Sequence, residues 1–99
     1  MTDIGHPTET DPHLYRVVFE NDKVRVVEYR DTPGARTRRH RHPGSVMITL
    51  SAFRRRMIWG DKSLDVDRLP FEASWLPEQT HIGENIGETG THMLFVEIK

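Results

Sequence analysis

The most restrictive feature of this sequence is the spacing of its apolar residues, which recur at every second position in short runs. The clearest runs lie at 24–29, 46–51 and 92–98. Successive side chains of a β-strand point to opposite faces, so this period is typical of strands. Turn-forming pairs such as Pro33-Gly34 separate the runs about every 8 to 12 residues, as in sandwiches and barrels. We predict an all-β domain of about eight or nine strands with essentially no helix.

The length of 99 residues allows one domain with one modest core, because chains divide into separate cores only well above this size. Residues 1–13 are rich in proline, threonine and acids and have no hydrophobic period, so we expect a flexible N-terminal arm there. The domain proper then occupies residues 14–99. His6 and His13 lie in the arm, and we assign them no chemical role.

Composition argues against several classes of protein. No apolar run approaches the roughly 20 residues of a membrane-spanning helix, so we expect no membrane partner. The first residues resemble no secretory signal, and we expect a cytoplasmic protein. The absence of cysteine removes disulfides, thiolate ligands and thiol catalysis. Any metal ion must therefore be held by histidine, carboxylate or amide groups.

The charges nearly balance, with 14 basic and 15 acidic side chains. Half of the basic residues lie between Arg36 and Arg56, a stretch that contains no acid, so we expect one face to be locally positive. A near-neutral chain without interleaved aromatic and basic residues argues against a nucleic-acid partner.

Several predicted strands are apolar on both faces, most clearly at 46–48 and 93–98. In a strand with one face in water, apolar residues would alternate with polar ones. The strands at 46–48 and 93–98 lack this alternation, so both of their faces need to be covered. Either the same chain covers both faces or a second subunit covers one. We predict a homodimer.

Three histidines carry the strongest chemical signal. His40 and His42 are separated by one residue, so on a strand both point to one face, about 6 to 7 Å apart. Two imidazoles placed in this way reach a common metal ion at about 2.1 Å. His81, which follows Pro77 at a predicted strand edge, is the third candidate ligand. The alternative is a polar lining of a barrel without metal.

Around these histidines the chain resembles the small single-domain metal-binding cupins of bacteria. The opening of the first cupin motif is similar to residues 34–42, in which Gly34 is followed after five residues by His-Arg-His at 40–42. Pro77, His81 and Asn85 are similar to the second motif. The resemblance implies a jelly-roll β-barrel whose interior holds one divalent ion on the three histidines.

The sequence departs from the cupin pattern at the motif glutamate, the one anionic ligand of the family. Val46 and Met47 stand there, and alignment on a His-Pro-Gly turn puts Met47 at the ligand position, with Thr49 following it inward. A thioether is a poor ligand for a hard or borderline divalent ion. The resemblance therefore implies an all-histidine site, of the type that holds zinc in hydrolytic enzymes and iron in some dioxygenases.

Five further residues are candidates for the surroundings of the site. Arg38 has the parity of the first two histidines, so on a regular strand it points inward and receives a carboxylate, whereas a bulge turns it to solvent. Gln79 either donates a fourth ligand or caps a turn. Tyr29 and Trp75 either wall the pocket or belong to the core. His92 lies near the site or at an interface.

The resemblance implies two alternative functions for a small-molecule ligand. The first is a metal-dependent enzyme, a dioxygenase or else an isomerase or lyase, that acts on a small anionic or enolisable metabolite with iron, zinc, nickel or manganese. The second is a non-catalytic cupin that binds or senses a metabolite, which the missing glutamate favours. No catalytic residue is assigned, because cupins host many unrelated activities.

Overall fold

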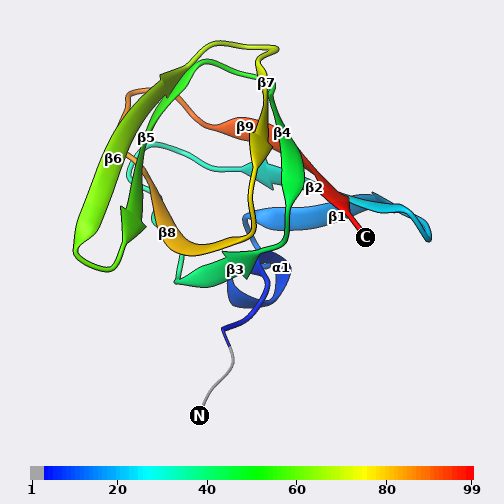
Figure 1. Ribbon diagram of the computed structural model, residues 1–99. Coiled ribbons are helices and arrows are strands. Elements are labelled where there is room, and N and C mark those ends of the chain that lie inside the picture. The colour runs from blue at the N-terminus through cyan, green and yellow to red at the C-terminus, as the bar shows by residue number, and fades with distance from the viewer. Residues whose placement is uncertain (1–3) are drawn as a thin grey trace.

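The structure is a computed structural model that describes residues 4–99. Over these residues the chain forms one short helix and nine strands, which confirms the predicted all-β class (Figure 1). All strand pairs are antiparallel. The elements are α1 (Pro7–Thr10), β1 (Tyr15–Glu20), β2 (Val24–Arg30), β3 (His40–His42), β4 (Ser45–Thr49), β5 (Phe53–Trp59), β6 (Lys62–Arg68), β7 (Ala73–Leu76), β8 (Gln79–Asn85) and β9 (His92–Ile98).

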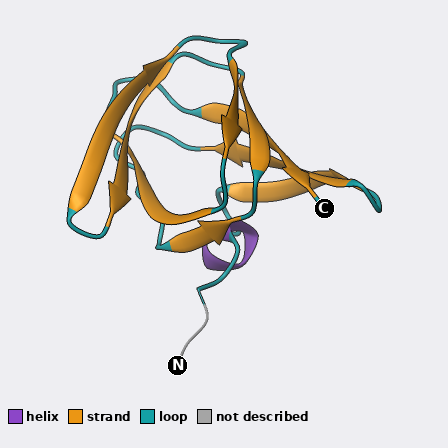
Figure 2. Cartoon of the chain, in the orientation of Figure 1, coloured by secondary structure: helices purple, strands orange, loops and turns teal. Residues whose placement is uncertain are grey.

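The strands form two sheets that face each other as the walls of a barrel (Figure 2). One sheet has the order β1-β2-β9-β4-β7, and the other has the order β3-β8-β5-β6. Neighbours in each sheet are often distant in the chain, as where Val24 of β2 pairs with Ile98 of β9. Two facing antiparallel sheets in which neighbouring strands are distant in the chain are the arrangement of a jelly roll. Within the described residues, no helix has the length and apolar character needed to cross a membrane.

The core lies between the sheets and is built from alternate residues of the strands. On β9, for example, Met93 and Phe95 are buried, whereas Leu94 and Val96 between them are only half-buried on the outer face. The strands predicted to be apolar on both faces therefore have one face covered by the second sheet and one face open in the single chain. The buried apolar residues are Tyr15, Val27, Tyr29, Met47, Phe53, Met93 and Phe95.

A buried carboxylate joins the two sheets. Asp31 follows β2, and its oxygens accept hydrogen bonds from the Tyr29 hydroxyl, Arg55 Nη1 at 2.6 Å, Asn85 Nδ2 at 2.8 Å and the Thr91 backbone N–H at 2.9 Å. Burial alone would raise the pKa of Asp31, but these hydrogen bonds and the Arg55 charge outweigh burial and hold the pKa below its ordinary value. Donors from both sheets thus converge on one ionised group.

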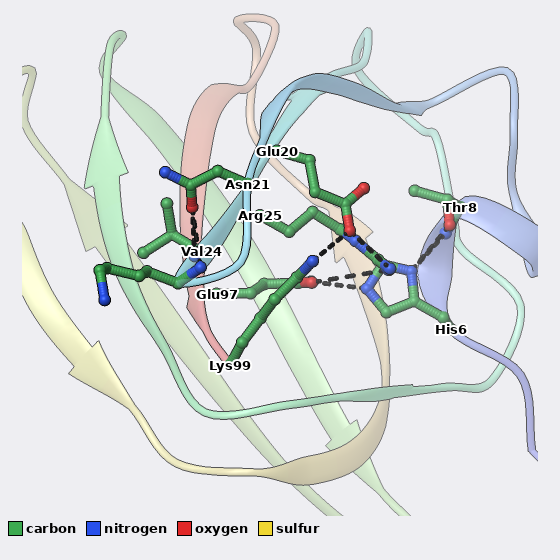
Figure 3. Close-up of polar contacts among 9 residues, drawn as sticks. His6, Thr8, Glu20, Asn21, Val24, Arg25, Glu97 and Lys99 are labelled. Carbon is green, nitrogen blue, oxygen red and sulfur yellow. Dashed lines mark hydrogen bonds and ion pairs between the residues drawn. The ribbon is translucent and has the colours of Figure 1, made fainter.

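Residues 4–13 of the predicted arm lie against the barrel, and residues 1–3 are outside the described part. The single turn of α1 is capped by His6, whose Nδ1 accepts the backbone N–H of Thr8 at 3.2 Å. This leaves Nε2 of His6 as the donor to the buried Glu97 carboxylate, 2.5 Å away (Figure 3). His6 therefore has a structural role, and the expectation of no helix misses this turn because a capped four-residue segment has no measurable period.

The arm also protects the open edge of β3, the last strand of its sheet. The Arg41 N–H donates to the Gly5 carbonyl at 2.9 Å, and the Arg38 N–H donates to the Asp11 carboxylate at 3.0 Å. Asp11 is buried by this contact. One backbone N–H of this edge strand, that of Arg41, is thereby satisfied within the chain, and the Arg38 contact holds the residues just before the strand.

We predict that Asp31→Ala lowers the free energy of unfolding by about 3 to 5 kcal/mol, because it leaves the Arg55 charge buried without a counter-ion. Urea denaturation followed by circular dichroism measures this loss. Asp67→Ala is the matched control, because its carboxylate is exposed and only 3.8 Å from Arg54; its effect stays within about 0.5 kcal/mol. Equal effects of the two substitutions would contradict a structural role for the buried carboxylate.

Candidate metal centre

The three histidines come together through the pairing of β3 with β8. His40 lies directly opposite His81 in this pair, and His42 lies opposite Gln79. Residues opposite each other on antiparallel strands share a face, so all three rings point to the same side. Each is buried, with at most 3% of its surface exposed, whereas Arg41 between the first two points outward and is exposed.

The three rings are close together and nearly perpendicular to one another. The centroids of His40 and His42 are 4.5 Å apart, and each lies 4.9 Å from that of His81. The interplanar angles lie between 81° and 89°. One ring nitrogen from each residue falls within 4.8 Å of the other two. The rings therefore converge on one point instead of stacking.

Hydrogen bonding leaves a nitrogen of each ring without a partner. Nδ1 of His40 lies 2.9 Å from the Arg38 carbonyl and must donate to it, so Nε2 carries the free lone pair. Nε2 of His40, Nδ1 of His42 and Nδ1 of His81 are buried without a hydrogen-bond partner among residues 4–99. An unsatisfied buried polar atom costs about 1 to 3 kcal/mol. Nitrogen donors in this arrangement fit a divalent transition-metal ion.

Burial also keeps the three rings uncharged. It lowers the pKa of His40 to about 4 and that of His81 to about 3, and it holds the pKa of His42 well below its ordinary value. For His42 and His81 the charge of a neighbouring histidine adds to this effect. Metal binding at neutral pH therefore displaces no proton from these rings.

A cavity of about 200 Å³ opens against His42 and His81 inside the barrel. Most of its wall is apolar, and Met47 is part of that wall. Tyr15 also lines the cavity, with its ring centroid 5.6 Å from that of His40 and 6.1 Å from that of His42. The three histidines thus adjoin a small, mostly apolar cavity.

Solved structures share this arrangement of strands. A cupin domain from Bordetella pertussis is 24% identical, with a TM-score of 0.81 over 100% of this chain and 98% of its own. The chain has the cupin fold. A protein with a double-stranded β-helix domain from Klebsiella pneumoniae is similar to this chain at 20% identity and a TM-score of 0.66, over 97% of this chain and 79% of its own. A cupin-2 domain protein from Shewanella frigidimarina is 14% identical, with a TM-score of 0.58 over 86% of this chain and 79% of its own.

Comparisons by sequence add no family assignment for this chain. No protein-family model matches the chain, and no curated protein matches it.

Two of the residues predicted around the site line the cavity. Met47 is buried and faces inward, as its parity predicts. Gln79 also lines the cavity, and its amide is engaged: Oε1 accepts from Trp59 Nε1 at 3.0 Å, and Nε2 donates to the Pro77 carbonyl at 3.3 Å. Thr49 is buried, but it is not part of the lining, because its hydroxyl donates to the Leu69 carbonyl.

Three other predicted residues do not line the cavity. Arg38 is exposed, because residues 37–39 lie outside the strand that begins at His40 and the parity argument does not extend to them. Trp75 is 59% exposed on the outer face. Tyr29 is fully buried in the core with its hydroxyl on Asp31.

His92 also lies away from the histidine cluster. It is on the outer face of the five-stranded sheet, where its Nε2 is 2.8 Å from a Glu28 carboxylate oxygen. His92 is therefore not part of the surroundings of the three histidines.

The predicted positive face is largely neutralised. Of the seven arginines in this stretch, four pair with acids that come later in the chain and a fifth is buried. Pairing across strands is invisible in a local count of charges. The pairs are Arg36 with Glu84, Arg41 with Glu78, Arg54 with Asp67, and Arg56 with Asp65.

Sequence reasoning missed Arg55 and Tyr15 as cavity residues. A signal for Arg55 was present, because it has the parity of Phe53 and Met57, which face inward on the same strand. Tyr15 begins the first strand and has no such signal, since its approach to the histidines depends on how β1 pairs with β2.

We predict that the metal-free protein loses stability as the pH falls from 6.5 to 4.5. An unfolded histidine binds its proton near pH 6.5, whereas the folded His81 stays neutral until about pH 3, so protons favour the unfolded chain in this window. This histidine contributes about 1.4 kcal/mol per pH unit there. Urea denaturation at pH 7, 6 and 5 in the presence of a chelator measures the slope.

His81→Gln reduces this slope, whereas His13→Gln, at an exposed position of the arm, leaves it unchanged. Parallel stability curves for wild type and His81→Gln would show that the folded ring accepts protons as readily as the unfolded one.

Proposed function

We propose that this cupin binds one divalent transition-metal ion through His40, His42 and His81 and acts with it on a small anionic or enolisable metabolite. An oxygenase-type reaction is the leading candidate, with isomerase or lyase chemistry as the nearest variants, and iron, zinc, nickel and manganese are the candidate ions. The observation that carries this proposal is the convergence of three buried, neutral rings, each with a nitrogen that lacks a partner in the described chain.

The residues around the site suit such chemistry. A bound ion would supply Lewis acidity and, in the case of iron, a route for electrons to O₂. Because all three ligands are neutral, they leave both positive charges of the ion uncompensated, which favours an anionic ligand. The Arg38 carbonyl fixes the tautomer of His40, and the apolar wall limits the access of water. We further propose a cytoplasmic protein without a nucleic-acid partner, in keeping with a chain that needs no disulfide and pairs most of its clustered arginines.

A non-catalytic role in binding or sensing a metabolite is the second candidate. One observation favours it: no aspartate or glutamate within residues 4–99 lines the cavity. A reaction that needs a carboxylate as general base or anionic metal ligand has none available there. The phenol of Tyr15 is the only hydroxyl in the lining, and burial raises its pKa well above the ordinary value.

We predict that wild-type protein purified without chelators retains about one equivalent of transition metal per chain and that His81→Ala retains less than about a tenth of that, because two histidines hold such an ion weakly. Elemental analysis measures both. His92→Ala is the control, since this ring lies on the outer face, and it keeps the wild-type content. Equal metal in wild type and His81→Ala would remove the basis of the proposal.

The same preparations separate the two candidate functions. Oxygen consumption by the metal-loaded protein with a panel of small acids and diketones, absent in His81→Ala, supports an enzyme. A metabolite that raises the melting temperature of the metal-free and metal-loaded forms equally, without turnover, supports the binding role.

We also propose that the cupin is a homodimer joined through the outer face of its five-stranded sheet. An unbroken row of apolar side chains crosses all five strands in register: Phe19, Val26, Val96, Val46 and Trp75. The residues at the two ends of the row are more than half exposed. A second copy related by a twofold axis would cover the row with its own row.

We predict that wild-type protein elutes at twice its chain mass of 11.6 kDa and that Val96→Glu elutes at the monomer mass, because the charge stands in the middle of the apolar row. Size-exclusion chromatography with light scattering measures both masses. Leu69→Glu is the control at an exposed apolar position away from the row. A wild-type monomer at micromolar concentration would refute the dimer.

A further inference from the structure

We propose that Arg55 binds an anionic group of the ligand and that the cavity takes a small dicarboxylate, with one carboxylate at the three-histidine centre and the other on the Arg55 guanidinium. This inference rests on the proposed metal site and adds the class of ligand. It differs from the sequence-based expectation, in which Arg38 received the anion, because Arg38 is exposed and does not line the cavity.

Arg55 is held rigidly inside the barrel. It lies on β5 opposite Asn85 of β8, and only 3% of its surface is exposed. Its Nη1 donates to Asp31 at 2.6 Å and to the Thr91 hydroxyl at 3.2 Å. Its guanidinium carbon lies 4.8 Å from the centre of the Tyr29 ring. A guanidinium fixed in this way loses little freedom when it binds a ligand.

The other edge of the guanidinium is free. Nε and Nη2 donate to no group within the described residues, because both hydrogen bonds of this side chain come from Nη1. Nε and Nη2 together form the fork that binds a carboxylate with two parallel hydrogen bonds. An anionic ligand that enters the cavity would accept hydrogen bonds from both atoms.

The free edge lies on the same inner surface as the metal centre. A side-chain carbon on Gly83 would stand 2.6 Å from Nη2, so Nη2 occupies the space in which that residue has no side chain. Inward-facing positions on a strand recur every two residues, which places His81 about 6 to 7 Å farther along β8. Arg55, Gly83 and His81 all line the one cavity.

The electrostatics agree with this proximity. Burial is the main cause of the low pKa of each of the three histidines, and the Arg55 charge lowers it further in all three. Asp31 already balances the charge of Arg55, whereas three neutral rings leave the two charges of a divalent ion unbalanced. A dianion therefore matches the two unbalanced charges of the ion.

The cavity wall between the three histidines and Arg55 determines which groups suit the middle of the ligand. Met47, Phe53, Met57 and Phe95 line the cavity and offer no hydrogen bond to the middle of a ligand beyond weak contacts to sulfur. A volume of about 200 Å³ and a span of about 6 to 7 Å suit a short aliphatic chain with a carboxylate at each end. Succinate and glutarate are therefore suitable probes.

The experiment titrates nickel-loaded protein by calorimetry with succinate and glutarate, and with butanoate and pentanoate as monocarboxylates of the same chain lengths. We expect the better dicarboxylate to bind at least about tenfold more tightly than the monocarboxylate of the same chain length. A charge-assisted pair of hydrogen bonds provides a difference of this size. Arg55→Lys keeps a charge beside Asp31 but has no fork, so this preference falls below about threefold.

Gly83→Ala is a second variant that keeps both charged groups of the ion pair and pushes a methyl group into the position of Nη2. It weakens binding of the dicarboxylate and spares that of the monocarboxylate, and it keeps the test decisive if Arg55→Lys does not fold. Arg56→Lys is the matched control, because the neighbouring arginine points outward and pairs with Asp65 at 2.8 Å. It retains the wild-type preference.

The outcomes separate this inference from the proposed function. If the protein binds nickel stoichiometrically but binds dicarboxylates and monocarboxylates equally, the role of Arg55 is wrong and the metal site stands. An unchanged preference in a folded Arg55→Lys or Gly83→Ala protein also overturns it. If no nickel binds, the metal site itself fails, and this inference fails with it.

Discussion

The Asp31 carboxylate lies between the two sheets with no exposed surface, and four donors converge on it. Two of these donors, Arg55 and Asn85, belong to the four-stranded sheet. A buried charge of this kind is tolerated only when its partners are all in place, so the position of each sheet depends on the other. The same contact turns Arg55 into a fixed part of the cavity wall. Structural stability and the chemistry of the cavity thus depend on one ion pair.

The metal centre is built on a short strand that needs support from the rest of the chain. β3 has three residues and a single strand partner, and the N-terminal arm bonds its other edge through Gly5 and holds the preceding Arg38 through Asp11. Burying three rings with unpartnered nitrogens opposes folding in the absence of an ion. An ion bound at the proposed site would therefore couple metal binding to folding, and the arm supports the strand that carries two of the three histidines.

Much of the fold and part of the site could be predicted from local pattern. Strands were found at the runs 24–29, 46–51 and 92–98 within one or two residues, because side-chain alternation is a property of the backbone itself. The shared direction of His40 and His42 follows from the same alternation. Arg38 shows the limit of this reasoning, because parity holds only while the strand is regular.

The sequence by itself determined an all-β domain without cysteine ligands and the pairing of two histidines on one face, since these depend on residue type and on the period of a strand. Only the tertiary structure decided that His81 stands opposite His40, that Asp31 binds Arg55 and that Trp75 faces outward. Each of these depends on the register between strands far apart in the chain. Register is set by packing and hydrogen bonds across the whole barrel, which no local period encodes.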